Sequence, residues 1–381
     1  MKIIAWYLPQ FHEIPENNKW WGKGFTDWVN VKKAKPLSEK HNQPRVPLNH
    51  NYYNLLEDSV KKWQTELAKE YGIYGFCMHH YWFDGKMLLE KPVEQYLNNK
   101  ELDLPFCICW ANEHWTNQWT SDSEKILIEQ KYGGKKEWRE HFLYLLPFFK
   151  DNRYICVDGK PFMVIYRPEL IECLNDMLDY WQELAKENGL LGLTFAYQGT
   201  KWDFVKQKDD SRFSYDIEYQ PILCWNRERQ KYFSVKIQDI LPNWFLSAFA
   251  KPLNIIKGIL LRHENQKCSV RDYDEVWQEV LSYQPVSEKS IPGAFVDWDN
   301  TPRKGNFGTY INNVTPEKFE RYFEAQLERA KSEYHKDMMF VFSWNEWAEG
   351  GYLEPDTKNG YGYLEAIKRA LEKQNLTEKN R

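Results

Sequence analysis

Two glutamates, Glu346 and Glu349, stand three residues apart in an aromatic and glycine-rich segment near the end of the chain. The apolar run before them, residues 338–342, is typical of a buried strand. Breaking an acetal needs one carboxylic acid to protonate the leaving oxygen and one carboxylate to meet the charge developing at the anomeric carbon. Side chains at i and i+3 of a helical turn share a face, with about 5–6 Å between Cβ atoms. The pair predicts sugar cleavage or transfer; the alternative is that both acids cap and solvate a helix start.

The elements that must position these acids follow a regular pattern. Short apolar strands alternate with amphipathic helical stretches, which favours βα units and a parallel sheet. Eight strands are predicted, at residues 3–8, 72–78, 105–110, 162–166, 193–197, 216–220, 293–298 and 338–343. Helices are predicted at residues 58–71, 136–149, 170–188, 273–283, 316–334 and 360–372. This order predicts an α/β fold, a (β/α)8 TIM barrel with long loops on the catalytic face, where the carboxyl ends of the strands lie.

Polar and aromatic residues gather at those predicted strand ends and in the segments beside them. Aromatic rings offer a flat apolar face, and for Tyr and Trp a polar handle, which suits sugar rings that expose C–H patches together with hydroxyls. Any single ring or amide could instead be structural, but convergence of separate segments on one face favours a site. The predicted substrate-binding residues are Tyr7, His12, Trp28, His79, His80, Trp82, Trp110, Asn112, Glu113, Trp115, Tyr166, Tyr197, Asp297, Trp298 and Asn345.

Metal binding is the competing interpretation for two of these groups. His79 and His80 with His114 could ligate zinc, but adjacent residues on a strand point to opposite faces. We therefore expect these histidines to bond sugar hydroxyls. Asp297 and Asp299 match the loose Asp-x-Asp pattern with which nucleotide-sugar transferases hold a divalent ion, yet the chain shows no glycine-rich phosphate loop of usual spacing. No metal and no cofactor is expected.

The composition excludes some classes of partner and indicates others. A formal net charge of −4 lacks the basic footprint of a general nucleic-acid binder. The chain holds 18 Trp and 24 Tyr, so many rings must lie at surfaces or clefts, although most single rings are expected in the core. An oligosaccharide or polysaccharide is therefore the expected partner.

We predict one catalytic domain over residues 1–372 and a polar tail over residues 373–381. Two long segments interrupt the βα pattern, residues 9–57 and an insertion at about residues 224–271. Residues 225–271 carry nine Lys or Arg against three Asp or Glu, interleaved with apolar residues. Such a segment could lie on an anionic membrane surface or meet a lipid-linked glycan. Packing on the barrel or on a second subunit is the alternative.

The seven cysteines include no Cys-x-x-Cys pair, and Cys77, Cys107, Cys109 and Cys156 lie in or beside apolar runs. That pattern predicts buried thiols in a reducing compartment. The apolar stretch at the N-terminus is too short for a signal peptide, and no run approaches the roughly 20 residues of a membrane span. A cytoplasmic location is predicted.

Five sequence motifs, taken together and in this order, indicate a protein family. They are AWYLPQFH (residues 5–12), GFTDW (24–28), WANE (110–113), DWDNTPR (297–303) and WNEWAEG (344–350). On these the chain resembles the WbsX-like proteins, whose domain is similar to glycoside hydrolase family 99, over roughly residues 2–370. The resemblance implies a (β/α)8 barrel acting on α-linked mannose-type sugars with retention, and a link to bacterial surface polysaccharide and O-antigen.

The resemblance also implies roles for the two acids. Glu346 would be the base on the sugar 2-hydroxyl, which attacks the anomeric carbon to give a 1,2-anhydro intermediate. Glu349 would be the acid that protonates the leaving group and then the base that activates water or an acceptor hydroxyl. The chain departs from family 99 at Gly350-Gly351, where that family has Gly-Thr, and those hydrolases are usually exported.

Two other functions stay open at this point. One is a glycosyltransferase that uses a nucleotide-sugar donor with a divalent metal at Asp297 and Asp299, in lipopolysaccharide or capsule biosynthesis. The other is a carbohydrate-binding or scaffold protein with an inactive barrel, against which an intact acid pair argues.

Overall fold

The barrel sheet contains all the predicted strands. The computed structural model describes residues 1–117, 125–200, 209–229 and 268–379. Its main sheet runs in the order β12-β10-β9-β8-β4-β2-β1-β15-β13, with every neighbouring pair along that path parallel. These strands are β1 (Lys2–Tyr7), β2 (Gly75–Phe83), β4 (Phe106–Trp110), β8 (Lys160–Ile165), β9 (Thr194–Gly199), β10 (Tyr215–Glu218), β12 (Ser290–Ile291), β13 (Gly293–Phe295) and β15 (Met338–Phe342). The predicted (β/α)8 barrel is confirmed.

The ring closes through one interrupted strand, residues 290–295. β12 pairs with β10, and β13 pairs with β15, so the two halves of this segment bond opposite neighbours. Pro292 separates them because proline has no N–H to donate, and its carbonyl accepts from Phe340 N at 3.2 Å. A Cβ atom at Gly293 would lie 1.7 Å from the Glu218 carbonyl oxygen, so the close approach at this point requires glycine.

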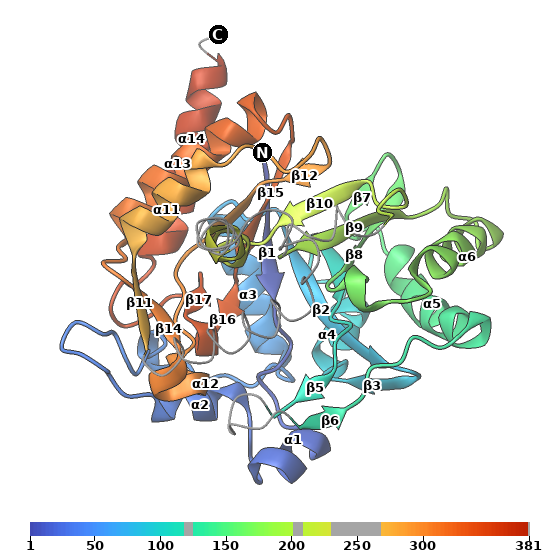
Figure 1. Cartoon of the computed structure of the whole chain (residues 1–381), viewed down its shortest axis with the longest axis horizontal. Helices are drawn as coiled ribbons and strands as arrows, with labels where there is room; N and C mark the ends of the chain where they lie inside the picture. Colours follow the sequence, from blue (N-terminus) through green and yellow to red (C-terminus); the bar gives the residue numbers. More distant parts are fainter. Residues whose placement is uncertain (118–124, 201–208, 230–267, 380–381) are drawn as a thin grey trace, which may run out of the picture.

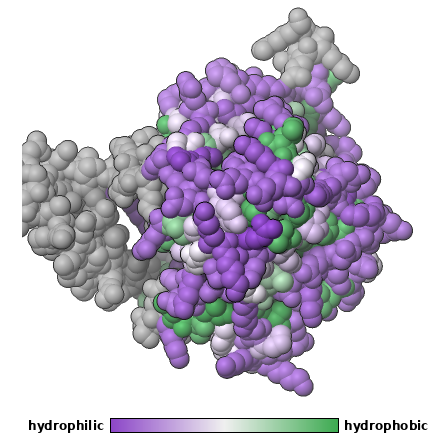
Figure 2. All heavy atoms as spheres, turned by 90° about the vertical axis from the view of Figure 1, so that its right-hand side faces the viewer, coloured by the Kyte–Doolittle hydropathy of each residue, from purple (hydrophilic) through white to green (hydrophobic). Residues whose placement is uncertain are grey.

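Helices cover the outside of the barrel (Figure 1). They are α3 (Asp58–Glu70), α4 (Lys91–Asn98), α5 (Lys135–Phe149), α6 (Leu174–Glu187), α11 (Tyr273–Ser282), α13 (Pro316–Ser332) and α14 (Gly362–Lys379). In α13, Pro316 stands in the first turn after the capping Thr315, and Phe319, Phe323 and Leu327 recur every fourth residue as its buried stripe. α14 continues through most of the predicted polar tail. The face on the α5 and α6 side is mostly hydrophilic (Figure 2), as expected when amphipathic helices turn their apolar stripes inward.

Short elements gather at the carboxyl end of the barrel (Figure 1). After β1 the chain forms α1 (Pro15–Trp21), α2 (Asp27–Lys33) and the 3-10 turn η1 (Leu48–His50). Others are β3 (Lys86–Leu88), β5 (Trp115–Thr116), β6 (Ile126–Ile128), η2 (Pro168–Leu170), α12 (Thr301–Lys304), η3 (Gly305–Phe307), β14 (Thr309–Asn312), β16 (Asn345–Glu346), η4 (Trp347–Glu349) and β17 (Gly351–Tyr352), with β11 (Ser269–Asp272) pairing with β14. The predicted long loops over the catalytic face are thus partly folded.

The cysteine prediction holds in part. Cys77, Cys107 and Cys109 are buried free thiols, but Cys156 is exposed. It lies on the two-residue strand β7 (Cys156–Val157), which pairs with β8 and lies off the main path of the sheet.

Most of the predicted basic insertion, residues 230–267, lies outside the described residues. Its membrane contact stays a prediction. Within the part of the chain that the structure describes, no helix has the length and apolarity needed to cross a membrane.

Candidate active site

The two glutamates are held by the turn that follows β15. Asn345 clamps the ends of β15 and β1 together: its Oδ1 accepts from Leu8 N at 2.8 Å and its Nδ2 donates to Leu8 O at 3.0 Å. Ser343 Oγ accepts from Glu346 N at 2.9 Å. The turn ends at Gly350, whose φ of 72° lies in the left-handed region that favours glycine. Glu346 and Glu349 are therefore fixed to the barrel rim. Asn345, predicted to bind substrate, is occupied with this clamp.

One arginine joins the acid pair. Arg303 of α12 donates from Nη1 to Glu349 Oε1 at 2.7 Å and from Nη2 to Glu346 Oε1 at 3.0 Å. The same Nη2 bonds Asp27 Oδ2, at the start of α2. A single buried guanidinium thus serves three carboxylates, Glu346 and Glu349 from the turn after β15 and Asp27 from α2.

Burial dominates the electrostatics of this cluster. It raises the pKa of Glu346 well above its usual value; the Arg303 charge opposes that rise, while Glu349 and Asp27 add to it. Burial would lower the pKa of Arg303, but the three carboxylates outweigh it and raise that pKa. The Glu346 side chain is 3% exposed and that of Glu349 23%. Glu349 is therefore the acid open to the cavity.

The acids face a cavity of about 240 Å³ at the mouth of the barrel. Burial lowers the pKa of His79 to about 4, so this lining imidazole is neutral near pH 7. Tyr81 and Tyr219 reach the cavity from β2 and from the end of β10. The full lining is Leu8, Gln10, Asn17, Trp21, Phe25, Asp27, His79, Tyr81, Leu89, Ala111, Glu113, His114, Trp115, Thr116, Leu127, Tyr166, Tyr219, Arg303, Glu346 and Glu349. A chamber of aromatic faces, hydroxyls and carboxylates has the chemistry needed to hold a sugar ring.

Four of the predicted substrate-binding residues line this cavity: His79, Glu113, Trp115 and Tyr166. Glu113 pairs with Arg167 at 3.0 Å, which places both charges beside the cavity. Trp115 packs edge to face against Tyr81, with ring centroids 5.4 Å apart. Contact of these four with substrate remains a prediction.

Another group of predicted residues points from the strands toward the helices. His80 Nε2 lies 3.0 Å from His141 Nε2 of α5, and Trp82 stacks on the same ring at 4.5 Å. Tyr7 donates to Gln64 of α3 at 2.8 Å. The physical reason is that alternate residues of a strand face opposite sides of the sheet. A prediction based only on position at a strand end therefore includes about twice as many residues as can face the cavity. Trp110, packed on His141 and Trp181, and Tyr197, packed on Phe213, belong to this group.

Three further predicted residues, Trp28 of α2 and the loop residues Asn112 and His12, lie outside the cavity lining. Trp28 donates from Nε1 to Tyr53 O at 2.8 Å. Asn112 bonds the backbone of Arg167 through both ends of its amide, at 2.7 and 2.8 Å. His12 is buried, and burial lowers its pKa to about 4. None of the three lines the cavity.

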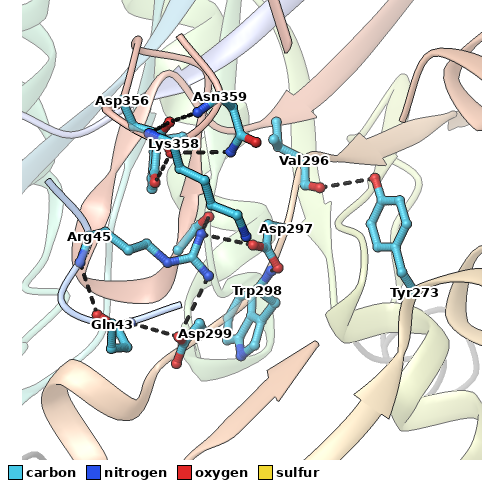
Figure 3. Close-up of polar contacts among 12 residues, drawn as sticks. Gln43, Arg45, Tyr273, Val296, Asp297, Trp298, Asp299, Asp356, Lys358 and Asn359 are labelled. Atoms are coloured by element: carbon cyan, nitrogen blue, oxygen red, sulfur yellow. Dashed lines mark hydrogen bonds and ion pairs between the residues drawn. The ribbon is translucent and has the colours of Figure 1, made fainter. Parts of the chain in front are cut away.

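Asp297 and Trp298 also lie away from the cavity, around a second buried arginine (Figure 3). Arg45 contacts Asp297 Oδ2 at 2.8 Å and Asp299 Oδ2 at 3.5 Å. His41 and Gln43 reach Asp299 Oδ2 at 2.8 and 2.6 Å. Trp298 packs on Phe342 and Trp225.

This arrangement weighs against a divalent ion at the Asp-x-Asp segment, because a fixed guanidinium already lies against both carboxylates. In the described ranges no group of three or more His, Cys, Asp or Glu side chains is arranged to hold a metal ion.

Three residues that line the cavity, Asp27, Arg303 and Tyr81, are absent from the predicted site. Asp27 lies in the GFTDW segment and Arg303 ends the DWDNTPR segment. A charge-balance argument could have found Arg303, because two buried acids need a cation nearby. Tyr81 follows His79 by two residues on the same strand face, so it could have been found by alternation.

Comparisons with known proteins identify the family and the fold of the chain. The family model "Glycosyltransferase WbsX" matches residues 3–367. The uncharacterized protein WxcX of Xanthomonas campestris pv. campestris is 32% identical over 377 residues, which cover 97% of this chain and 49% of WxcX. The chain thus spans about half the length of the curated relatives it matches.

Among solved structures, the GH99 endo-alpha-mannosidase from Bacteroides thetaiotaomicron superposes with a TM-score of 0.57 at 12% identity, covering 99% of this chain and 98% of that one. A glycoside hydrolase-like protein gives a TM-score of 0.60 at 12% identity, covering 97% and 93%. At such identity the likeness concerns the fold.

Proposed function

Because the chain belongs to the WbsX family of glycosyltransferases, and is therefore a carbohydrate-active enzyme of glycosidic bonds, we propose that it cleaves or transfers at an α-linked, mannose-type bond with retention of configuration. The observation that carries the proposal is the pair Glu346 and Glu349, which face one cavity and share one guanidinium. The resemblance to family 99 supplies the roles.

Glu346 is the base of the first step. It takes the proton from the sugar 2-hydroxyl, whose oxygen attacks the anomeric carbon as the bond to the leaving oxygen breaks. A base is more effective when its pKa approaches the working pH, and burial raises the pKa of Glu346 in that direction.

Glu349 serves both halves of the reaction. As an acid it protonates the leaving oxygen; as a carboxylate it then takes a proton from water or from an acceptor hydroxyl, whose oxygen attacks the anomeric carbon. The 1,2-anhydro ring opens, Glu346 returns its proton to the sugar O2, and the configuration is restored. Its partial exposure to the cavity suits this exchange with incoming molecules. A retaining centre of this kind transfers whenever a sugar hydroxyl replaces water.

The proposed substrate is an oligosaccharide or polysaccharide of the bacterial surface, with O-antigen as the expected context. Action on a lipid-linked glycan and a cytoplasmic location belong to the same proposal. The family description as a glycosyltransferase keeps a sugar-nucleotide donor as the second candidate.

Calorimetric titration separates these candidates. A mannose-type iminosugar, which mimics the charged transition state, is titrated against wild type, Glu346→Gln and the matched control Tyr197→Phe, whose side chain faces the helices. In parallel, sugar nucleotides are titrated with magnesium. We expect iminosugar binding in wild type and control and its loss in Glu346→Gln. Binding of a sugar nucleotide alone would contradict the proposal.

A further inference from the structure

A third carboxylate, Asp27, belongs to the acid pair's cluster although it is remote from it in sequence. Asp27 Oδ2 accepts from Arg303 Nη2 and, at 2.6 Å, from Gln10 Nε2. Its Oδ1 accepts from Asn30 Nδ2 at 2.8 Å. Asp27 is 5% exposed. Its carboxylate is therefore bonded from three sides within the lining of the cavity.

Glu346 accepts hydrogen bonds from two of the same donors, Gln10 and Arg303, but over longer distances than Asp27 does. Gln10 Nε2 lies 3.4 Å from both Glu346 oxygens but 2.6 Å from Asp27. Arg303 Nη2 contacts Glu346 at 3.0 Å while it also bonds Asp27. Asn30 adds a donor to Asp27 that Glu346 lacks. Hydrogen bonds to the charged form of a carboxylate favour that form, so the longer bonds at Glu346 stabilise its charge less than shorter bonds would.

The charge balance points the same way. Three carboxylates around one guanidinium would leave two uncompensated negative charges if all were ionised. Buried like charges resist joint ionisation, so the least well bonded acid keeps its proton longest. That acid is Glu346, because it is 3% exposed against 23% for Glu349 and its hydrogen bonds are longer than those of Asp27.

We propose that Asp27 is a positioning residue that sets the protonation of Glu346, by holding Arg303 and Gln10 on its own side. The catalytic meaning of this coupling rests on the proposed function, in which Glu346 is the base. By withholding donors, Asp27 keeps Glu346 a stronger base for a sugar hydroxyl than a fully solvated glutamate.

The other titratable groups around the cluster do not compete for this proton near neutral pH. Burial raises the pKa of Tyr81, Tyr166 and Tyr219, with nearby carboxylates adding to the rise, so these phenols stay neutral. Burial lowers the pKa of His79 to about 4, so it stays uncharged. Glu349 shares Arg303 with the other two acids, and its titration is followed separately below.

The test is a pH titration of the protein by infrared spectroscopy, which requires no substrate. The C=O band of the protonated Glu346 carboxyl is identified by its loss in Glu346→Gln, and that of Glu349 by its loss in Glu349→Gln. In wild type we expect the Glu346 midpoint above the ordinary glutamate value. Asp27→Asn should lower that midpoint by about one pH unit, a tenfold fall in proton affinity.

Controls keep the result specific. Asp27→Glu retains the charge and should keep the midpoint near that of wild type, and Asp103→Asn, which removes a surface acid paired with Lys69, should leave it unchanged. If Asp27→Asn fails to fold by circular dichroism, Asp27→Ser offers a second neutral variant with room for water. An unchanged Glu346 midpoint in a folded neutral variant would overturn the proposal.

Activity measurements separate this proposal from the one on which it rests. With a cleavable α-mannoside, the acidic limb of the kcat/KM profile should move to lower pH in Asp27→Asn by the same amount as the infrared midpoint. An infrared shift in an enzyme whose Glu346→Gln variant stays active would refute the role of Glu346 but leave the coupling. An inactive Glu346→Gln with no infrared shift in Asp27→Asn would refute the coupling alone.

Discussion

Two buried arginines at neighbouring points of the barrel rim are surrounded by carboxylates in different ways. Arg303 has three carboxylates and opens on the cavity. Arg45 has two, Asp297 and Asp299, and the second of these also bonds His41, Gln43 and Thr301. The first cluster has two more carboxylates than guanidinium groups, whereas the second has one more, and its Asp299 is bonded by several further groups. Burying excess charge is costly, so it persists where it is used, whereas a carboxylate with many bonds is suited to holding loops.

The backbone links the two clusters. Asp299 N donates to Glu349 O at 2.7 Å, and a Cβ at Gly350 would lie 2.9 Å from Asp299 N, which explains how closely these loops pack. The Arg45 cluster is therefore the support on which the turn of Glu349 rests.

The largest difference between the Arg303 and Arg45 clusters should appear in the catalytic rate. Glu349→Gln removes the proposed acid and should lower the rate on an α-mannoside by about 10²–10⁴-fold, because proton transfer by a positioned group contributes that much. Unfolding by urea should show little change. A rate within tenfold of wild type would remove Glu349 from the mechanism.

Stability should respond most at the other cluster. Arg45→Met leaves two buried carboxylates without their cation and should lower the free energy of unfolding by about 3–5 kcal/mol. Glu346→Gln removes a charge from the overloaded cluster and should be neutral or stabilising. The comparison is made by urea denaturation at pH 7, and equal losses in both variants would contradict it.

The pH dependence of stability should have opposite signs at Asp299 and at Glu346. Burial alone would raise the pKa of Asp299, but the His41 hydrogen bond and the Arg45 charge outweigh it and lower the pKa to about 2. A depressed pKa stabilises above the unfolded value of 3.8, so Asp299→Asn should cost about 2 kcal/mol at pH 7 and progressively less as the pH falls toward 2.

Glu346 behaves in the reverse sense. Its folded pKa is raised, so its contribution is most favourable below 4.5 and is lost as the pH rises through the folded pKa. The stability of Glu346→Gln relative to wild type should therefore grow with pH. Thermal unfolding of both variants from pH 3 to pH 8 measures this, and parallel curves would contradict the assignment.

The smallest expected change in kcat/KM distinguishes strand residues that face the cavity from those that face outward. Tyr166 lines the cavity and Tyr197 packs outward on Phe213. Tyr166→Phe should lower kcat/KM by a few-fold, the worth of about 1 kcal/mol for one hydrogen bond. Tyr197→Phe should change it less than twofold, and a reversal of that order would show that the inward face is misassigned.

Much of the fold could be predicted because hydrophobic periodicity reports directly on strands and helices. The eight predicted strands agree with the structure within a few residues, since most are apolar runs buried on both sides, as in β4 and β15; β10 (YDIE) has the weakest apolar pattern. α1, α2 and α4 were missed, because each is only seven or eight residues long and lies among prolines and loops. Residues 290–295 pair partly with β10 and partly with β15 because the barrel closes at this point. Local sequence patterns do not predict such a closure.

The candidate site could be predicted only as far as its chain positions. The glutamates and His79 lie where strand ends predict them. His80, Trp82 and Tyr197 were chosen for residue type, but strand alternation turns them toward helices. Asp27 joins Glu346 through Arg303 across segments hundreds of residues apart, and such a partnership becomes visible only in three dimensions.

We propose that the Arg303 cluster carries out retaining chemistry at an α-glycosidic bond. Proton NMR of the anomeric signal would identify the first product released from an α-mannose oligosaccharide by wild type and by Glu349→Gln. We expect the α-anomer to appear first and to mutarotate slowly, and we expect the variant to give neither product nor transfer at a comparable rate. First appearance of the β-anomer, or the same product at wild-type rate from Glu349→Gln, would contradict this proposal.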